Sequence, residues 1–185
     1  MVNNQDDDLL LKANAFDRKA ITEIYEAYQQ PLYRYIYRQV GSVETARDLT
    51  SELFSRFLQA VKNGTGPTRQ LKAWLYRVGH NTVVDYYRRQ QHRDHLPLND
   101  LFVDANEDPV RSAELNIDAE RVRLALTRLT PDQRQVISLK FFAGFTNQEI
   151  AEVMDKPVGA VKALQHRAIA ALQRQLVPME EQAYL

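Results

Sequence analysis

Residues 146–172 read TNQEIAEVMDKPVGAVKALQHRAIAAL, and this stretch predicts two helices separated by a tight turn. A capping box at Thr146–Glu149 begins the first helix, which we expect to run to about Met154. Residues 155–157 form the turn, and the second helix continues to about Leu176. Inward-facing residues recur at helical spacing in both helices: Ile150, Ala151 and Met154 in the first, and Val158, Val161 and either Leu164 or Ile169 in the second. A small alanine lets two helices cross closely, so the stretch predicts a helix-turn-helix.

The second helix of this motif carries the chemistry expected of a DNA reader. Small residues near its start, Gly159 and Ala163 among them, let the helix N-terminus approach phosphate. Lys162, His166 and Arg167 are then placed for phosphates or base edges in the major groove. A generic helical hairpin remains the alternative, and the motif alone does not separate a repressor, a response-regulator output domain and a sigma factor.

Helix signals are dense along the rest of the chain, and strand signals are sparse. Asp17 and Ser42 are predicted N-caps, Gly41 and Gly144 are predicted helix ends, and Thr130 opens a second capping box. Further helices are predicted over residues 9–13, 17–37, 42–61, 69–89, 117–129 and 130–143. The chain is therefore predicted to be all-α, with two small helical bundles.

Between the two bundles the sequence changes character, over about residues 92–116. Proline, asparagine and aspartate interrupt the helical periodicity there. Residues 96–120 hold seven acids and one base, which makes this the most acidic part of the chain. The composition predicts a flexible acidic linker that joins an N-terminal domain, residues 1–91, to a C-terminal domain, residues 117–185.

Composition limits the class of protein. The chain has 185 residues, of which 44% are hydrophobic, and this permits one domain or two small ones. It has no cysteine, which excludes disulfides and cysteine-ligated zinc. No apolar run reaches the roughly 20 residues that span a bilayer, and the first residues lack a signal-peptide pattern. We expect a soluble cytoplasmic protein that needs neither a metal nor another cofactor.

The net charge is zero, but the charges are unevenly distributed. Seven bases and two acids fall between Lys62 and His95, and four bases and no acid fall between Lys156 and Arg174. Two separated basic regions suit a polyanion that is touched at two places. An ordinary solvated helix surface is the alternative on charge alone.

Three stretches together resemble conserved regions of the extracytoplasmic-function sigma factors of bacterial RNA polymerase. They are ARDLTSELF at residues 46–54, LKAWLYRVGHNTVVDYYRR at residues 71–89, and residues 126–172. The resemblance implies that the first helix docks on the clamp helices of the polymerase. It implies that the second melts and reads the minus-ten promoter element, and that the third stretch reads the minus-thirty-five element.

The resemblance also implies contact residues for each partner. In the polymerase-binding stretch, Asp48 and Glu52 lie four positions apart and therefore on one helical face. The polymerase contacts are Asp48, Glu52 and Phe54. Cations interleaved with aromatic rings suit a single DNA strand, and the minus-ten contacts are Lys62, Arg69, Lys72, Trp74, Arg77, Asn81, Arg88 and Arg89. The minus-thirty-five contacts are Lys156, Lys162, Gln165, His166 and Arg167.

Some positions stay open at this stage. Trp74 is the only tryptophan, and a core position is favoured for it over a DNA contact. The end of the same helix, Tyr86–Arg89, is expected to face the surface. In the family, the loop between Lys62 and Arg69 captures a flipped base, but a plain connecting loop is the alternative. The sequence departs from the usual family pattern at Gly79-His80 and at Ala160–Leu164, where a hydroxyl and a guanidinium are missing.

The function that these features favour is a sigma factor, which directs core RNA polymerase to promoters and has no catalytic activity. A stand-alone helix-turn-helix transcriptional regulator is the alternative, but a sensor domain has no need of the aromatic and basic helix at residues 71–89. The four histidines show no metal-ligand spacing, and no phosphate-binding loop is present. The expected partners are core polymerase, promoter DNA and an anti-sigma factor, possibly membrane-anchored, with no small-molecule substrate.

Overall fold

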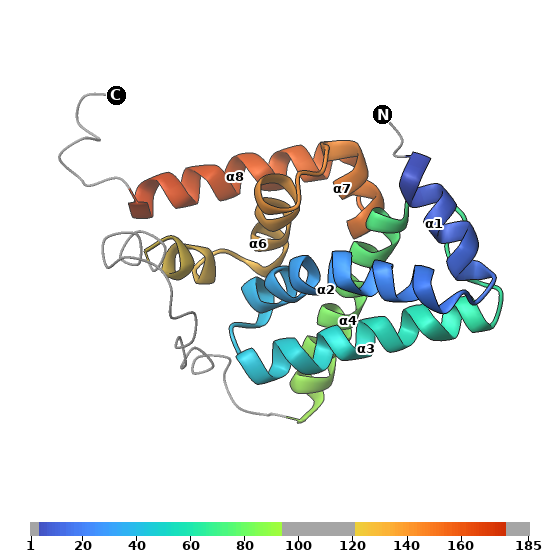
Figure 1. Ribbon diagram of the computed structural model, residues 1–185. Helices are drawn as coiled ribbons and strands as arrows, with labels where there is room; N and C mark the ends of the chain where they lie inside the picture. The colour runs from blue at the N-terminus through green and yellow to red at the C-terminus, as the bar shows by residue number, and fades with distance from the viewer. Residues whose placement is uncertain (1–3, 94–120, 177–185) are drawn as a thin grey trace, which may run out of the picture. The chain divides into compact units, whose positions relative to one another are not determined.

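The structure is a computed structural model that describes residues 4–93 and 121–176 (Figure 1). Every regular element in these two ranges is helical and none is a strand, so the predicted all-α class is confirmed. No helix within them is both long and apolar enough to cross a membrane. The chain divides into two compact units. The predicted linker, residues 92–116, lies outside the described residues except for its first two positions.

The first unit consists of four helices. They are α1 (Asn4–Asn14), α2 (Arg18–Val40), α3 (Val43–Lys62) and α4 (Leu71–Arg93). The short connections between the first three explain why they follow each other so closely in space (Figure 1). Helix α4 is longer than predicted at its C-terminal end, because it continues through residues 90–93, where the sequence reads QQHR and carries no helix breaker.

The predicted helix boundaries of the first unit depend on local capping. The carboxylate of Asp17 accepts hydrogen bonds from the backbone N–H groups of Lys19 and Ala20 at 2.8 and 3.1 Å. Gly41 ends α2 at φ 74°, in the left-handed region that favours glycine. Ser42 then caps α3 by accepting from the backbone N–H of Thr45. These predicted caps are confirmed.

The core of the first unit lies between α2, α3 and α4. Its fully buried side chains include Ile24, Leu32, Tyr35, Ile36, Leu53, Phe57 and Leu75. Gly79 permits the close approach of α4, since a Cβ there would lie 3.1 Å from Leu53 Cδ1 and 3.5 Å from the Tyr35 ring. This close packing gives a physical reason for glycine at one of the positions where the sequence departs from the family pattern.

The second unit contains a helix over residues 121–127, then α6 (Pro131–Ile137), the π-helical turn η1 (Ser138–Phe142), most of α7 (Asn147–Met154), and α8 (Val158–Leu176). Both predicted capping boxes are confirmed. The hydroxyl of Thr130 accepts from the N–H of Gln133, whose side chain accepts from the Thr130 N–H. Thr146 and Glu149 make the same reciprocal pair at the start of α7.

The predicted helix-turn-helix is present. Helix α7 ends at Met154, Asp155 takes a positive φ of 52°, and α8 begins at Val158. The backbone N–H of Lys156 closes the turn by donating to the carbonyl of Ala151 at 3.0 Å. Four of the predicted inward-facing residues are buried, namely Ile150, Ala151, Met154 and Val161, whereas Val158, Leu164 and Ile169 are half-buried.

Arg134 joins the helix over residues 121–127 to α6. The residue is only 6% exposed, and its guanidinium donates to the carbonyls of Leu126, Thr127 and Leu129 at 2.9–3.2 Å. It therefore satisfies carbonyls that have no partner within the preceding helix. An apolar cluster lies beside it and includes α8 residues, with Leu126, Leu129, Ile137 and Ala168 buried at its centre.

The sequence did not predict the π-helical turn η1. The predicted helix after Thr130 was continuous up to Gly144, but α6 ends at Ile137 and the Ala143 N–H donates to the Ser138 carbonyl instead. Gly144 does terminate the helical run, at φ 74°. The turn leaves Phe141 and Phe142 exposed by 58% and 47%.

Candidate protein and nucleic-acid interfaces

Helix α3 presents the residues predicted to meet the polymerase in three different environments. Asp48 is exposed, and no ion pair to it is found within the described ranges. Glu52 is 32% exposed and forms ion pairs with Arg56 of its own helix and with Arg89 of α4. Phe54 is only 6% exposed, because its ring packs against Tyr25 of α2 with centroids 4.8 Å apart. Tyr25, which is 48% exposed, is therefore the aromatic ring that this region offers to a partner.

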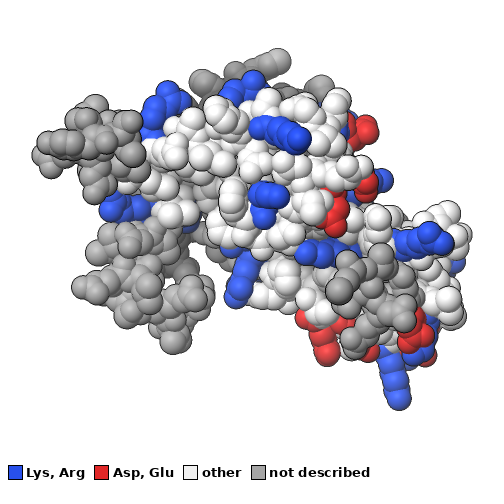
Figure 2. Space-filling view, turned by 90° about the horizontal axis from the view of Figure 1, so that it is seen from above, with Lys and Arg blue, Asp and Glu red and all other residues white. Residues whose placement is uncertain are grey.

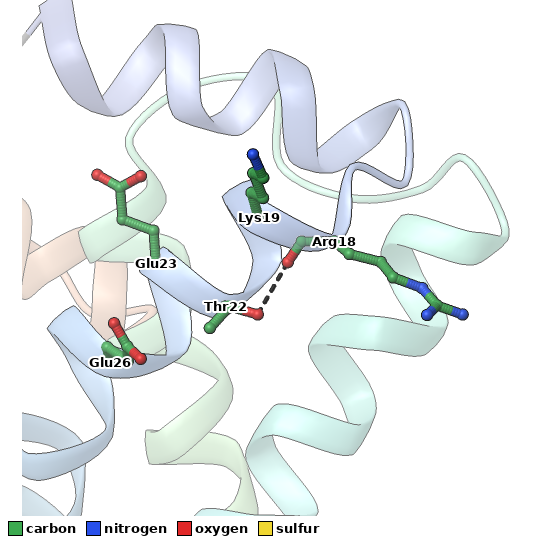
Figure 3. Close-up of a pocket in the computed structure, with 5 residues that line it drawn as sticks. All are labelled: Arg18, Lys19, Thr22, Glu23 and Glu26. Atoms are coloured by element: carbon green, nitrogen blue, oxygen red, sulfur yellow. Dashed lines mark hydrogen bonds between the residues drawn. The ribbon is translucent and has the colours of Figure 1, made fainter.

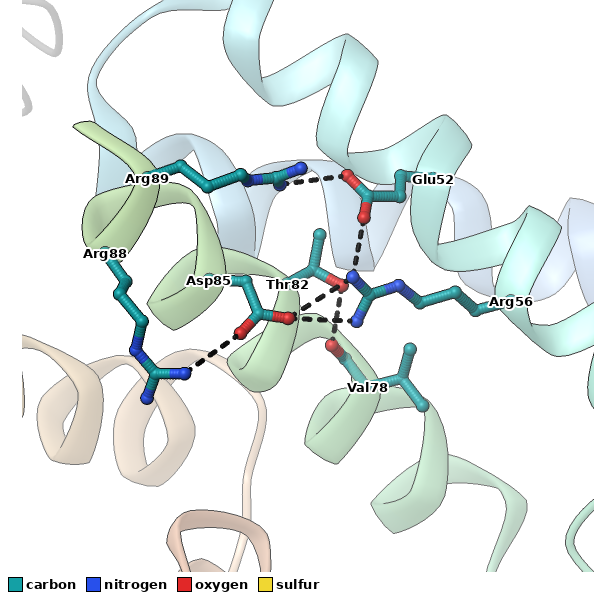
Figure 4. Close-up of polar contacts among 7 residues, drawn as sticks. All are labelled: Glu52, Arg56, Val78, Thr82, Asp85, Arg88 and Arg89. Carbon is teal, nitrogen blue, oxygen red and sulfur yellow. Dashed lines mark hydrogen bonds and ion pairs between the residues drawn. The ribbon is translucent and has the colours of Figure 1, made fainter. Parts of the chain in front are cut away.

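Glu52 belongs to a network of five charged residues that spans α3 and α4 (Figure 4). Arg56 of α3 lies at its centre and donates to Glu52 Oε1 at 2.6 Å and to Asp85 Oδ2 at 3.3 and 3.4 Å. The other oxygens of the two carboxylates face α4 arginines, with Arg89 at 3.4 Å from Glu52 Oε2 and Arg88 at 3.9 Å from Asp85 Oδ1. The structure thus pairs a predicted polymerase contact with a predicted DNA contact.

One stripe of α4 carries several of the predicted minus-ten contacts. Trp74, Arg77, Asn81 and Arg88 are spaced by three, four and seven residues, which places them on one face of the helix. Arg77, Asn81 and Arg88 are exposed, as is Lys72 on the neighbouring turn. Trp74 is half-buried and packs edge-on against Phe57 at a centroid distance of 5.8 Å. Part of its ring thus belongs to the core and part stays accessible.

Two contacts made by tyrosines hold α4 against α2. The hydroxyl of Tyr87 donates to the Gln39 carbonyl at 2.7 Å. Of the helix end expected to face the surface, Arg88 and Arg89 are exposed, whereas Tyr86 and Tyr87 are half-buried. Tyr76 packs edge-on against Tyr35 at 5.1 Å. Burial raises the pKa of the Tyr76 phenol, and burial lowers the pKa of the nearby Arg38 guanidinium, with Arg34 adding to the lowering. These anchors fix the position of the basic stripe.

The loop between α3 and α4 has a constrained backbone. Its ends carry Lys62 and Arg69, both exposed. The Asn14 amide of α1 donates to the Pro67 carbonyl at 2.9 Å, and a Cβ at Gly66 would lie 2.6 Å from the Asn14 Oδ1 atom. Glycine at position 66 therefore leaves room for the Asn14 side chain, so packing gives a physical reason for it.

Helix α8 separates a buried face from a basic one. Val161 and Ala168 are fully buried, whereas Lys162, His166 and Arg167 are exposed and Gln165 is half-buried. No ion pair to the three exposed residues is found within the described part of the chain. Lys156 differs, since its ammonium lies 3.1 Å from the Asp132 carboxylate. The exposed face of α8 thus retains three of the five predicted minus-thirty-five contacts as solvent-facing groups.

Other surface features of the described residues do not suggest a small-molecule site. Figure 2 shows lysines and arginines scattered singly over one face, among many uncharged residues. A shallow hollow of about 470 Å³ lies along the first turns of α2 and is lined by Arg18, Lys19, Thr22, Glu23 and Glu26 (Figure 3). The only hydrogen bond drawn there is from the Thr22 hydroxyl to the Arg18 carbonyl, within the helix itself. No group of His, Asp and Glu suited to a metal occurs among the described residues.

Sequence reasoning did not identify Arg56, Asn14 or Tyr25. Arg56 lies four residues after Glu52, a spacing that predicts an ion pair along one helix. Its second partner, Asp85, lies 29 residues away in sequence, and no local pattern indicates that contact. Asn14 and Tyr25 likewise gain their roles only from residues that are distant in sequence, Pro67 and Phe54.

Comparisons with known protein families match both units. The model described as Sigma-70 region 2 matches residues 24–93, and the model described as Sigma-70, region 4 matches residues 119–172. Together these spans include α3, α4, the helix-turn-helix and nearly all of the residues discussed above.

Two curated relatives cover most of the chain. The ECF RNA polymerase sigma factor BldN of Streptomyces coelicolor is 36% identical over 91% of this chain, which spans 65% of that protein's length. The RNA polymerase sigma factor YlaC of Bacillus subtilis is 26% identical over 89% of this chain and 96% of its own length.

Two solved structures share the fold. CnrH, solved with the cytosolic domain of CnrY, gives a TM-score of 0.70 at 23% identity and covers 92% of this chain and 96% of its own. The sigma factor RpoE, solved with the anti-sigma factor NepR from Bartonella quintana, gives 0.72 at 22% identity and covers 85% of this chain and 97% of its own. With both family regions matched in order, this chain belongs to the sigma-70 family of RNA polymerase sigma factors, in its extracytoplasmic-function group.

Proposed function

We propose that this chain binds core RNA polymerase and directs it to promoters, as a sigma factor with no catalytic activity of its own. The observation that carries the proposal is the presence, in one chain, of a region 2 with an exposed basic and aromatic stripe and a region 4 with an exposed basic helix face. A promoter is a polyanion that is contacted at two separated elements, and these two surfaces suit those two tasks.

Polymerase binding is assigned to α3 and the adjoining part of α2. Asp48 offers an exposed carboxylate, and Tyr25 offers an exposed ring on the neighbouring helix. Such a combination suits a partner surface with basic and apolar side chains, because the charge orients the encounter and the ring is buried on docking. Phe54 supports this surface from below by packing against Tyr25, and Glu52 contributes once its internal ion pairs are exchanged.

Minus-ten recognition is assigned to the stripe on α4 and the loop before it. The accessible part of Trp74 is available for stacking with a base, and Asn81 provides an amide for a base edge. Phosphates of the single strand are then met by the exposed cations around these two residues, which are Lys62, Arg69, Lys72, Arg77, Arg88 and Arg89.

Minus-thirty-five recognition is assigned to α8. Lys162 and Arg167 are proposed phosphate contacts, whereas His166 and Gln165 are proposed to read base edges in the major groove. Lys156 takes a lesser part, because its ammonium already pairs with Asp132. Residues 1–91 and 117–185 are proposed as the two domains that carry these functions, joined by residues 92–116.

An anti-sigma factor is the proposed regulatory partner, and the cytoplasm is the proposed location. The structural relatives CnrH and RpoE were each solved with a bound protein, which in the RpoE structure is named an anti-sigma factor. Hydrogen exchange of this chain, isolated with its native partner, should reveal protection of α3 and α8. If neither helix gains protection, or if no partner is recovered before induction, this part of the proposal fails.

In vitro transcription tests the main function. Core RNA polymerase is mixed with the full chain and a genomic promoter library, and transcripts are counted with and without the protein. Start sites that depend on the protein and share two elements upstream would support the proposal. Sequence-specific DNA binding by the free chain, with no co-purification of polymerase, would instead favour a stand-alone helix-turn-helix regulator.

A further inference from the structure

The charged network between α3 and α4 has an ordered geometry in which one guanidinium serves two carboxylates (Figure 4). Arg56 contacts Glu52 through Oε1 and Asp85 through Oδ2. Each carboxylate turns its other oxygen to an arginine of α4, Glu52 to Arg89 and Asp85 to Arg88. Neither acid is therefore held by an α4 arginine alone.

Exposure separates the inner members of the network from the outer ones. The side chains of Arg56, Glu52 and Asp85 are 37%, 32% and 40% exposed. Those of Arg88 and Arg89 are 70% and 60% exposed, and the Arg88 contact, at 3.9 Å, is the longest of the set, while the Arg89 contact, at 3.4 Å, is as long as the longer of the two Arg56–Asp85 contacts. Long, solvent-screened ion pairs are weak, so the outer arginines are available for exchange to another anion.

The charges of the network do not cancel. Three arginines face two carboxylates, which leaves a net charge of one positive unit at the end of α4. Without Arg56 the same site would hold two arginines and two carboxylates and would be neutral. Each acid would then have an α4 arginine as its remaining partner, and the attraction of that arginine for phosphate would fall.

We propose that Arg56 is a positioning residue for promoter binding. By occupying the inner oxygens of Glu52 and Asp85, it keeps Arg88 and Arg89 only loosely held and the end of α4 positive, ready for the phosphates of the DNA strand. The inference rests on the proposed DNA contacts of Arg88 and Arg89. Arg56 itself touches no DNA in this scheme, since it acts through the two carboxylates.

Substitution of Arg56 by methionine, which keeps much of its length, tests this role. Full-length Arg56→Met protein is assembled with core polymerase and titrated onto a fluorescent forked DNA that the native holoenzyme has selected from a random pool. We expect about four- to fivefold weaker binding at 0.15 M salt, and a salt slope smaller by about one, equivalent to one lost phosphate contact. Arg18→Met is the matched control, since it removes an exposed arginine of the same unit that lies outside the network.

A second variant distinguishes the proposed electrostatic role of Arg56 from a purely structural role in holding α3 and α4 together. Asp85→Asn in the Arg56→Met background restores the net charge of one positive unit without restoring any contact of Arg56. Recovery of DNA affinity and of the salt slope is expected, and a structural brace would give no such rescue. Loss of affinity that persists in the double variant would overturn the proposal, as would unchanged binding of Arg56→Met.

The assumption about the α4 arginines is tested in the same assay. If Arg88→Ala and Arg89→Ala bind the forked DNA as the native protein does, the proposed DNA contacts are wrong, and the inference about Arg56 falls with them. If these two variants weaken binding but Arg56→Met does not, the DNA contacts stand and only the positioning role is overturned.

Discussion

The two basic surfaces of the molecule, at the end of α4 and on α8, differ in whether carboxylates lie next to their basic side chains. At the end of α4, Arg88 and Arg89 face carboxylates of Asp85 and Glu52 (Figure 4). On α8, Lys162 and Arg167 are exposed, and the sequence from Lys156 to Arg174 contains no acid at all. The α8 surface is thus positive from its own sequence, whereas the positive charge at the end of α4 depends on residues of another helix.

This difference suits the two kinds of DNA that a sigma factor meets. Duplex DNA has a regular, dense line of phosphates, and a helix with unopposed cations binds it without rearrangement. A melted strand is flexible, and its binding depends on stacking as well as on charge. In the proposed scheme, the weak pairing of Arg88 and Arg89 limits their binding to a nearby duplex, because an anion must first displace a carboxylate.

The largest expected effect is on polymerase binding, and it comes from Asp48, the predicted polymerase-binding acid that lies outside the charged network of α3 and α4. Asp48 is exposed, unlike Glu52, so reversing its charge should leave the fold intact and remove a polymerase contact. Asp48→Arg should weaken binding to core polymerase by at least about a hundredfold, since a like charge at an interface costs several kcal/mol. Pull-down with core enzyme measures this, and Glu23→Arg on α2 is the control with the same change in charge. Equal recovery of Asp48→Arg and native protein would contradict the assignment.

The next largest effect is on DNA binding, which can be compared directly between the two basic surfaces. Lys162→Ala combined with Arg167→Ala should weaken holoenzyme binding to a duplex upstream element about 25-fold at 0.15 M salt, with the salt slope lower by about two. Arg88→Ala combined with Arg89→Ala should weaken binding of a forked DNA by less, about fivefold, because carboxylates already offset part of their charge. Equal losses in the two titrations would show that the ion pairs at the end of α4 have no influence on DNA binding.

The sequence predicts contacts between residues that are close along the chain, but it does not predict contacts between distant ones. The caps at Asp17, Ser42, Thr130 and Thr146 were predicted because each acceptor lies within three residues of its donor. The contact of Arg134 with the helix before it was not predicted, since no pattern indicates which arginine will cap another helix's carbonyls. The π-helical turn was missed for a similar reason, because its spacing differs from an α-helix by a single residue per turn.

For the candidate site residues, too, the sequence indicates the helix face but not the tertiary partner. Periodicity placed Asp48, Glu52 and Phe54 on or beside one face of α3, but it did not reveal which of them meets α2 or α4. Burial of Phe54 and pairing of Glu52 with Arg89 are consequences of tertiary packing. On α8 the exposure of Lys162, His166 and Arg167 could be predicted, since the buried residues Val161 and Ala168 define the opposite face.

Substitution of one glycine in each unit should have a smaller effect, on the free energy of unfolding. Gly66 lies against α1, and an alanine there would place its Cβ 2.6 Å from Asn14 Oδ1, while the Asn14 amide is held by the Pro67 carbonyl. Gly66→Ala should therefore lower the free energy of unfolding by about 1–2 kcal/mol, the cost of a displaced hydrogen bond and local overpacking. Denaturant unfolding measures this. Added to Asn14→Ala, the same change should cost less than it does alone, and strict additivity would refute the clash.

Gly159 in the second unit should behave in the opposite way, with the smallest effect on stability. It lies near the start of α8, and a Cβ there would meet nothing within 4 Å. Alanine favours a helix over glycine, so Gly159→Ala should raise the free energy of unfolding by about 0.5 kcal/mol. DNA binding should nevertheless weaken, because the added methyl group lies where the helix N-terminus approaches a phosphate. Greater stability with unchanged affinity for the duplex upstream element would show that α8 meets DNA with another part of its face.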